Sequence, residues 1–202
     1  MIAAVVFDIG SVIEVIDHSV FPAPFEARHG LAPGAVAAAS DFEGEPGLGE
    51  IDEAGFRGHW QRRLGLSDTL ADELMADYWR WYVGTLDQPL VDWFARVRGR
   101  GLKAGILSNS GPGAREAEQL WGFEEMTDDI VYSHEVGLGK PDPAVYALTA
   151  ARLAVEPEQI VFLDDAEVNV EAARAAGWHA VLHEHTARSI AELERIIAAG
   201  GS

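Results

Sequence analysis

The chain has 202 residues, a formal net charge of −18 at pH 7 and no cysteine. Its acidity disfavours nucleic-acid partners, and the lack of cysteine excludes disulfides and thiolate metal sites. No segment reaches the roughly 20 apolar residues of a membrane span, and no basic region precedes the first apolar stretch as in a signal peptide. We therefore expect a cytoplasmic protein without membrane partners, in which an anionic ligand is met by a metal ion, a lysine or a helix N-terminus.

Five short apolar segments have the composition of strands that are buried on both faces of a parallel sheet. They span residues 3–7, 103–107, 130–132, 159–163 and 179–182. Helical patterns lie around the later segments, at residues 89–100, 142–153 and 168–176, and Gly101 is placed to end the first. This alternation predicts an α/β fold, a doubly wound (Rossmann-like) parallel sheet formed by residues 1–14 and 88–202.

Residues 15–87 interrupt the alternation and contain no evident strand. Two amphipathic helical patterns, at residues 47–66 and 67–86, dominate this stretch, and Ser67 is placed to cap the second. The aromatic run at residues 78–82 is more typical of a helical core than of a surface that stacks on sugars. We expect an inserted helical subdomain.

Polar side chains follow the predicted strands, at the edge of the sheet where open α/β folds bind ligands. They are Asp8, Ser108, Asn109, Lys140, Asp164 and Asp165. Converging carboxylates repel one another unless a cation holds them, and hard oxygen ligands suit Mg²⁺. A lysine and a hydroxyl beside backbone amides can bind a phosphoryl group, and a carboxylate can attack that group to form an acyl-phosphate.

Four segments resemble, in order, the motifs of the haloacid dehalogenase (HAD) superfamily: "FDIGSV", "ILSNSG", "GKPDPAVY" and "FLDDAEVNVEAA". The first is most similar to the DxG-type sugar phosphatases, a subgroup that includes α-glucose-1-phosphatase. The resemblance implies that residues 15–87 form a small helical cap. It also implies that Asp8 is the nucleophile of an aspartyl-phosphate mechanism, that Lys140 steadies nucleophile and phosphate, and that Ser108 and Asn109 join Lys140 in binding the phosphoryl group.

The same resemblance implies a Mg²⁺ site formed by Asp8, the backbone carbonyl of Gly10, Asp165 directly and Asp164 through water. The chain departs from the usual phosphatase motif at Gly10, where a second aspartate normally acts as general acid. Loss of such a group typically lowers the rate by roughly 10² to 10⁴. The candidates for its replacement are Glu14, Asp17, His18 or a carboxylate of the cap.

The sequence therefore predicts a Mg²⁺-dependent phosphomonoester hydrolase for a small phosphorylated metabolite, with a sugar phosphate as one candidate. Two alternatives stay open. One is a metal-independent haloacid dehalogenase, although such enzymes usually carry a bulky aromatic residue in place of Gly10. The other is a catalytically weak regulatory protein that binds phosphate. The His-Glu-His run at residues 183–185 lacks an evident third metal ligand, so we do not expect it to bind a metal. The sequence makes no prediction about the oligomeric state.

Overall fold

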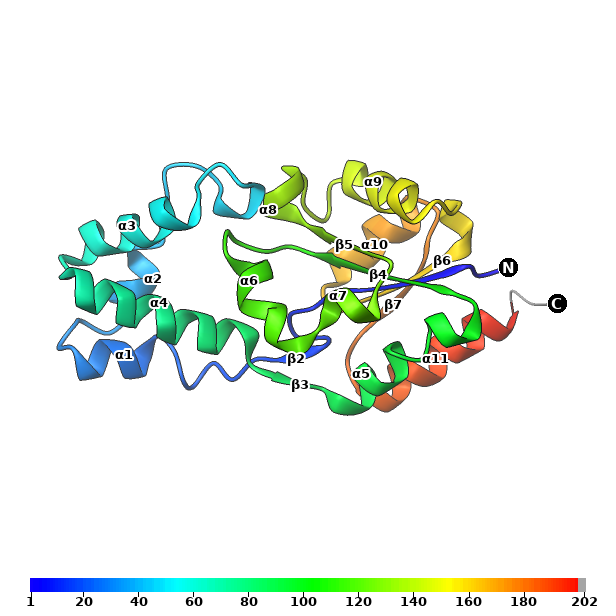
Figure 1. The fold of residues 1–202 in the computed structure, drawn as a ribbon, viewed down its shortest axis with the longest axis horizontal. Coiled ribbons are helices and arrows are strands. Elements are labelled where there is room, and N and C mark those ends of the chain that lie inside the picture. Colours follow the sequence, from blue (N-terminus) through cyan, green and yellow to red (C-terminus); the bar gives the residue numbers. More distant parts are fainter. Residues whose placement is uncertain (200–202) are drawn as a thin grey trace.

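A computed structural model describes residues 1–199 of the chain, so the last three residues of the predicted sheet domain lie outside the described part. Its main feature is a parallel sheet in the order β5-β4-β1-β6-β7 (Figure 1). The strands are β1 (Ala4–Phe7), β4 (Lys103–Ser108), β5 (Asp129–Tyr132), β6 (Ile160–Asp164) and β7 (His179–Leu182). The predicted doubly wound sheet is thus confirmed, with strand ends shifted by at most one residue.

The central strand β1 explains how an apolar run becomes a two-sided core. Its residues are fully buried, and because side chains alternate along a strand, Val5 and Phe7 enter one hydrophobic cluster while Ala4 and Val6 enter another. The first cluster also contains residues of α5 (Gln88–Phe94) and α11 (Thr186–Ala199). The second contains residues of α9 (Pro143–Leu153) and α10 (Glu167–Ala175). Helices therefore cover both faces of the sheet.

Short elements fill the connections of the sheet domain. They are η2 (Arg98–Arg100), α6 (Ala114–Glu118), η3 (Gln119–Trp121), α7 (Phe123–Met126), α8 (Ser133–Val136) and η4 (Pro157–Gln159). The helix predicted to run to residue 100 is α-helical only as far as Phe94, because the amides of Arg96 and Val97 bond to carbonyls three residues back. Gly101 ends this segment with φ of 81°, as predicted.

A helical subdomain lies at the end of the molecule away from the chain termini (Figure 1). It contains α1 (Ala23–Arg28), α2 (Ala35–Ala38), η1 (Pro46–Leu48), α3 (Glu53–Leu64) and α4 (Asp68–Val83). Ser67 caps α4 as predicted, accepting from the amide of Leu70 at 3.3 Å. The Tyr78 ring centroid lies 5.2 Å from that of Trp60, within a separate hydrophobic cluster, so this part of the aromatic run belongs to a core.

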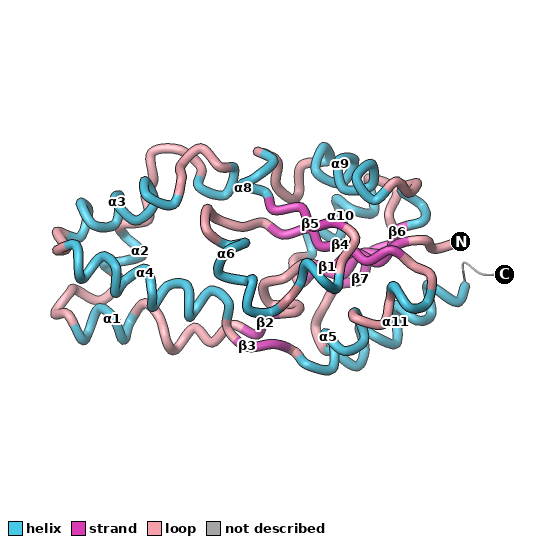
Figure 2. Tube along the Cα trace, in the orientation of Figure 1, coloured by secondary structure: helices cyan, strands magenta, loops and turns pink. Residues whose placement is uncertain are grey.

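Two short strands join the helical subdomain to the sheet domain. β2 (Glu14–Val15) and β3 (Thr85–Leu86) form an antiparallel pair. The two stretches of chain that connect the helical subdomain to the sheet domain therefore lie side by side (Figure 2). The expectation of no strand in residues 15–87 was wrong here, because two-residue strands are too short to show an alternating pattern. At Gly84 a Cβ would lie 2.3 Å from the Val15 carbonyl oxygen, so the crossing requires glycine. No helix within residues 1–199 is long and apolar enough to span a bilayer.

Candidate active site

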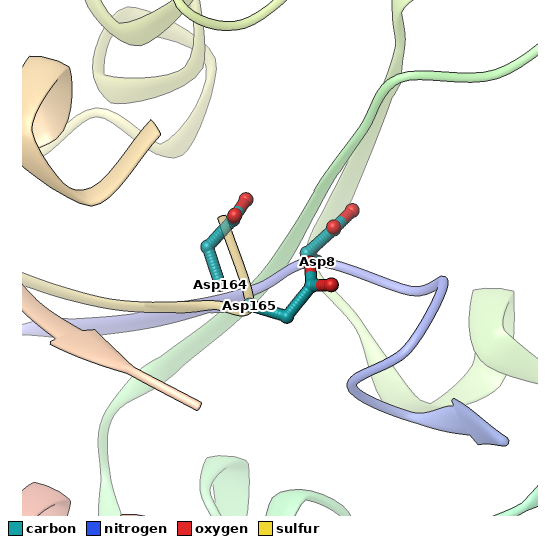
Figure 3. Close-up of side chains that lie close together, drawn as sticks. All are labelled: Asp8, Asp164 and Asp165. Atoms are coloured by element: carbon teal, nitrogen blue, oxygen red, sulfur yellow. The ribbon is translucent and has the colours of Figure 1, made fainter. Parts of the chain in front are cut away.

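Three carboxylates meet at the carboxyl edge of the two central strands. Asp8 directly follows β1, Asp164 ends β6 and Asp165 comes next, and one oxygen of each lies within 4.8 Å of the others (Figure 3). Their burial differs: Asp164 is fully buried, Asp8 is 9% exposed and Asp165 is exposed. An oxygen-only donor set of this kind fits a hard divalent cation such as Mg²⁺.

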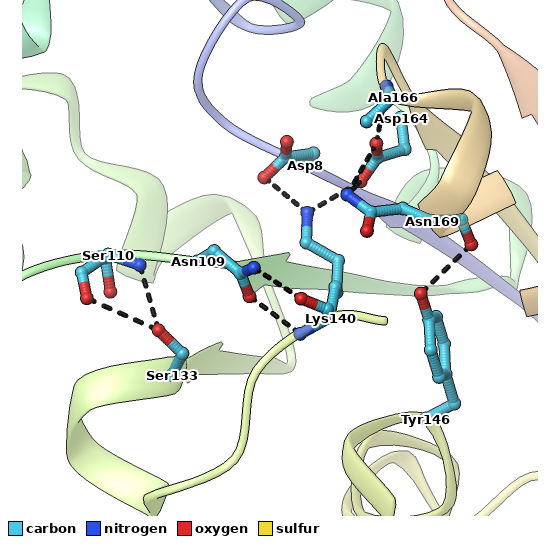
Figure 4. A network of polar contacts seen from close by, with 9 residues as sticks. All are labelled: Asp8, Asn109, Ser110, Ser133, Lys140, Tyr146, Asp164, Ala166 and Asn169. Carbon is cyan, nitrogen blue, oxygen red and sulfur yellow. Dashed lines mark hydrogen bonds and ion pairs between the residues drawn. The ribbon is translucent and has the colours of Figure 1, made fainter. Parts of the chain in front are cut away.

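Lys140 supplies the positive charge of the cluster. Its Nζ lies 2.8 Å from Asp8 Oδ1 and 2.6 Å from Asp164 Oδ2, and the residue is only 5% exposed (Figure 4). A single ammonium cannot neutralise three carboxylates that lie so close together. The charge balance of the site therefore also fits a bound divalent cation.

The two acids at the end of β6 differ in how many of their oxygens are engaged. Asp164 accepts from Lys140, from the amide of Ala166 at 2.8 Å and from Asn169 Nδ2 at 3.0 and 3.2 Å. Asp165 stands exposed beside it. Both oxygens of Asp164 thus hold protein groups in place, which leaves Asp165 better placed for direct contact with a cation.

Burial raises the pKa of Asp8 to about 6, while the nearby Lys140 ammonium acts to lower it and Asp164 to raise it. A carboxyl with this pKa is mostly ionised at neutral pH, the form that a nucleophile needs. A bound cation would favour the ionised form further.

Asn169 is a site residue that sequence analysis missed. It lies on the buried side of α10 with Val170 and Ala173, and its amide holds Asp164. Tyr146 donates in turn to the backbone carbonyl of Asn169 at 3.0 Å. The signal was present, because an asparagine that interrupts the apolar stripe of a helix needs a buried hydrogen-bond partner.

Asn109 fixes the main chain of Lys140 from both sides. Its Nδ2 donates to the Lys140 carbonyl at 2.7 Å, and its Oδ1 accepts from the Lys140 amide at 2.8 Å (Figure 4). Its amide group is therefore engaged in positioning the lysine, and the binding of phosphate by Asn109 stays a prediction. Ser108, 2% exposed, ends β4 at the same edge as Asp8, because Phe7 of β1 is paired with Ile106.

Gly10 lies in a tight turn after Asp8, where the Ile9 carbonyl accepts from the amides of Val12, Ile13 and Glu14. A Cβ built on Gly10 would have Ile16 Cδ1 as its nearest neighbour, at 3.7 Å, which is an ordinary contact. The backbone of this turn would therefore tolerate a side chain. Among residues 1–199, the carboxylates of Asp8, Asp164 and Asp165 are the metal-ligand cluster that the structure contains, and the His183-Glu184-His185 run forms none.

Two further carboxyls are buried near Asp8. Glu14 accepts from Trp121 Nε1 at 2.9 Å, and burial raises its pKa to about 9, with Glu118 and Asp8 adding to the shift. Glu118 accepts from the hydroxyl of Tyr132, and burial raises its pKa to about 8, with Asp8 acting in the same direction and Arg115 against it. Glu14, a candidate proton donor, thus keeps its proton at neutral pH, whereas Asp17 and His18 are exposed.

The burial of Glu118 makes stability depend on pH. Its pKa is raised from 4.5 to about 8 on folding, so between these values the folded chain binds the extra proton and stability falls as pH rises. From pH 5 to pH 8 the free energy of unfolding should fall in the wild type. We expect this fall to be smaller in Glu118→Gln, by about 1–3 kcal/mol. Urea denaturation at both pH values measures this. Glu116→Gln, on the exposed side of the same helix, is the control, and equal losses for all three proteins would contradict the prediction.

Comparison with known proteins identifies the family. The family model described as haloacid dehalogenase-like hydrolase matches residues 2–177. The chain belongs to this family. A protein named as a phosphatase from Mycobacterium tuberculosis is 33% identical to this HAD-like hydrolase over 132 residues, which are 63% of this chain and 59% of that protein. A phosphorylated carbohydrates phosphatase from Thermotoga maritima is 40% identical over 73 residues, 35% of this chain and 34% of that protein.

The matched stretches cover less than two thirds of either relative. Among solved structures, a HAD family enzyme from Bacteroides thetaiotaomicron in complex with magnesium and inorganic phosphate shares the fold with a TM-score of 0.73. It is 18% identical, and the superposition covers 91% of this HAD-like hydrolase and 95% of that chain. The resemblance to the superfamily is thereby confirmed, whereas membership of the DxG sugar-phosphatase subgroup stays a prediction.

Proposed function

We propose that this HAD-like hydrolase is a Mg²⁺-dependent phosphomonoesterase that uses Asp8 as its nucleophile. The observation that carries the proposal is the joining of Asp8 and Asp164 through the Nζ of Lys140, with Asp165 at the same point. Asp8, the Gly10 carbonyl and Asp165 would hold the cation, with Asp164 acting through water. When bound, Mg²⁺ would offset negative charge on the phosphoryl oxygens.

The remaining steps use groups of the chain. An oxygen of Asp8 attacks phosphorus, a bond forms between them, and the ester bond to the leaving group breaks. Lys140 and Ser108 stabilise charge on the transferring group, and Asn109 and Asn169 keep Lys140 and Asp164 in position. Water then attacks the phosphorus of the aspartyl-phosphate, which releases inorganic phosphate and restores the Asp8 carboxylate.

We propose further that the helical part, residues 15–87, acts as a cap over this site, with residues 1–14 and 88–202 as the catalytic domain. The β2–β3 pair gives it a narrow two-strand connection to the sheet domain. A cap that closes would exclude water from the reaction. Gly10 has no acid side chain to protonate the leaving group, so substrates whose leaving group departs easily are favoured. An anomeric sugar phosphate has such a leaving group. The Thermotoga relative, named for phosphorylated carbohydrates, supports a sugar phosphate.

Phosphate release from a panel of sugar, nucleotide and organic-acid phosphates, with Mg²⁺ or with EDTA, tests the proposal. We expect release that requires Mg²⁺ and is faster with glucose 1-phosphate than with glucose 6-phosphate. A clear preference for glucose 6-phosphate would refute the argument from the leaving group. Turnover of 2-haloacids in EDTA would instead support the dehalogenase alternative, and phosphate binding without turnover on the whole panel would support the regulatory one.

The space at Gly10 allows a direct test of the missing acid. A Cβ there meets only Ile16 Cδ1, at 3.7 Å, so Gly10→Asp can restore a carboxyl beside Asp8. We expect it to raise the turnover of glucose 6-phosphate by roughly 10²-fold, because a poor leaving group gains most from protonation. Glucose 1-phosphate should gain much less. Gly10→Ala, which adds a Cβ without an acid, is the control, and equal gains for both variants would exclude acid catalysis as the cause.

A further inference from the structure

Besides the β2–β3 pair and the contact of α4 with α6, the helical subdomain touches the sheet domain at a third place. Residues 46–49, comprising η1 and the glycine after it, lie on α8 of the sheet domain (Figure 1). The Gly47 carbonyl accepts from the hydroxyl of Ser133 at 2.6 Å. Leu48 Cδ2 would lie 3.5 Å from a Cβ on Gly139, the residue before Lys140. We refer to residues 46–49 as the docking loop.

Ser133 also holds the loop that follows β4. Its Oγ accepts from the amide of Ser110 at 2.9 Å, and the Ser110 carbonyl lies 3.3 Å from the same oxygen (Figure 4). The hydroxyl has one proton, so it can donate well to Gly47 or to Ser110 but not to both at once. Ser133 is 1% exposed, and water is therefore a poor substitute for either acceptor.

The position of Gly49 shows how closely the docking loop fits. Its φ is 74°, and a Cβ there would lie 2.1 Å from the His134 carbonyl oxygen. Gly34 of the same subdomain has a similar φ of 81° but no atom within 4 Å of its Cβ position. Both glycines thus have a positive φ that disfavours other residues. Only at Gly49 would a side chain also clash with the sheet domain.

From these contacts we propose that Ser133 is a positioning residue that couples docking of the helical subdomain to the loop after β4. With the docking loop seated, the hydroxyl donates to Gly47. When the docking loop moves away, the hydroxyl donates to the Ser110 carbonyl instead. Ser110 is the neighbour of Asn109, which holds the main chain of Lys140. The catalytic consequence rests on the proposed function, whereas the docking itself does not.

Docking can be measured without turnover, because the chain has no cysteine and spin labels can be placed freely. Ala38→Cys on α2 and Ala151→Cys on α9 are exposed sites in the two parts. We expect double electron–electron resonance to give one narrow distance distribution for the spin-labelled Ala38→Cys/Ala151→Cys protein. The same protein with Gly34→Ala added should give the same distribution. Gly49→Ala should give a longer or broader one, since its Cβ cannot fit against His134. If Gly49→Ala matches Gly34→Ala, the docking loop is not what holds the two parts together.

Ser133→Ala tests the coupling, and it also serves if Gly49→Ala does not fold. It should broaden the same distance distribution and lower kcat/KM for p-nitrophenyl phosphate by about tenfold. Because both changes act on one contact, the Gly49→Ala/Ser133→Ala double variant should show no larger fall in kcat/KM than the more affected single variant. A broadened distribution with unchanged kcat/KM would overturn the coupling while leaving docking intact. Fully additive losses would also overturn it. Absence of turnover in the unmutated enzyme, on p-nitrophenyl phosphate and on the whole panel of natural phosphates, would refute the proposed function alone; the distance measurements would still test the docking.

Discussion

Asp8→Asn is expected to abolish Mg²⁺-dependent phosphate release, with a loss of at least roughly 10⁴-fold. The amide oxygen of asparagine is a poor nucleophile and carries no charge to hold a cation. Asparagine has nearly the same shape, and the carboxyl that it replaces is buried, with a pKa raised to about 6, so the variant should still fold. Initial rates of phosphate release, with thermal unfolding as the check on folding, measure the effect.

Asp92→Asn is the matched control for this experiment. Asp92 is exposed on α5, and its carboxylate accepts from the side-chain amide of Gln88 at 2.7 Å. We expect it to keep activity within about twofold of the wild type, because it is a surface change away from the cluster. Turnover by a folded Asp8→Asn variant at a rate near that of Asp92→Asn would show that another residue attacks the substrate.

Lys140→Met should cost both activity and stability. The Lys140 side chain is almost fully buried between Asp8 and Asp164, and methionine fills a similar volume without the charge. Removing one partner of a buried ion pair typically destabilises a protein by about 3–5 kcal/mol, because the other partner is left buried and unpaired. We also expect phosphate release to fall by roughly 10³-fold or more, since charge stabilisation at the phosphoryl group is lost. Urea denaturation and initial rates measure the two effects.

Lys103→Met controls for the loss of a lysine as such. Lys103 is the only other lysine in the chain, and it is exposed at the start of β4, donating to the Leu153 carbonyl at 2.6 Å. We expect it to keep near-normal activity and to lose about 1 kcal/mol at most. If both methionine variants behaved alike, Lys140 would have no special place in the site.

The strands and the edge that carries the chemistry were predictable from sequence because each depends on local signals. Short Val- and Ile-rich runs that are buried on both faces stand out in a sequence, and parallel strands bring their carboxyl ends to one edge. Asp8, Lys140 and Asp164 were therefore placed together correctly, as the ion pairs show. The family resemblance of four ordered motifs added the prediction of their roles.

Features that depend on tertiary packing were not predictable in the same way. β2 and β3 are two residues each, and they exist because two distant segments meet. In the sequence Glu14 and Glu118 look like ordinary charged residues, and only the folded chain shows that both are buried, close enough to Asp8 for its charge to raise their pKa. Contacts across the two parts, such as that of Ser133 with Gly47, join residues 86 positions apart and have no local pattern.

The most direct test of the proposed mechanism is to look for phosphate on Asp8 during turnover. The enzyme is mixed with Mg²⁺ and p-nitrophenyl phosphate, quenched in acid within milliseconds, and digested for peptide mass spectrometry. We predict a phosphorylated peptide that contains Asp8, that is lost on treatment with hydroxylamine and that does not form in EDTA. Steady phosphate release with no such peptide, or with the phosphate on another residue, would contradict the assignment of Asp8 as the nucleophile.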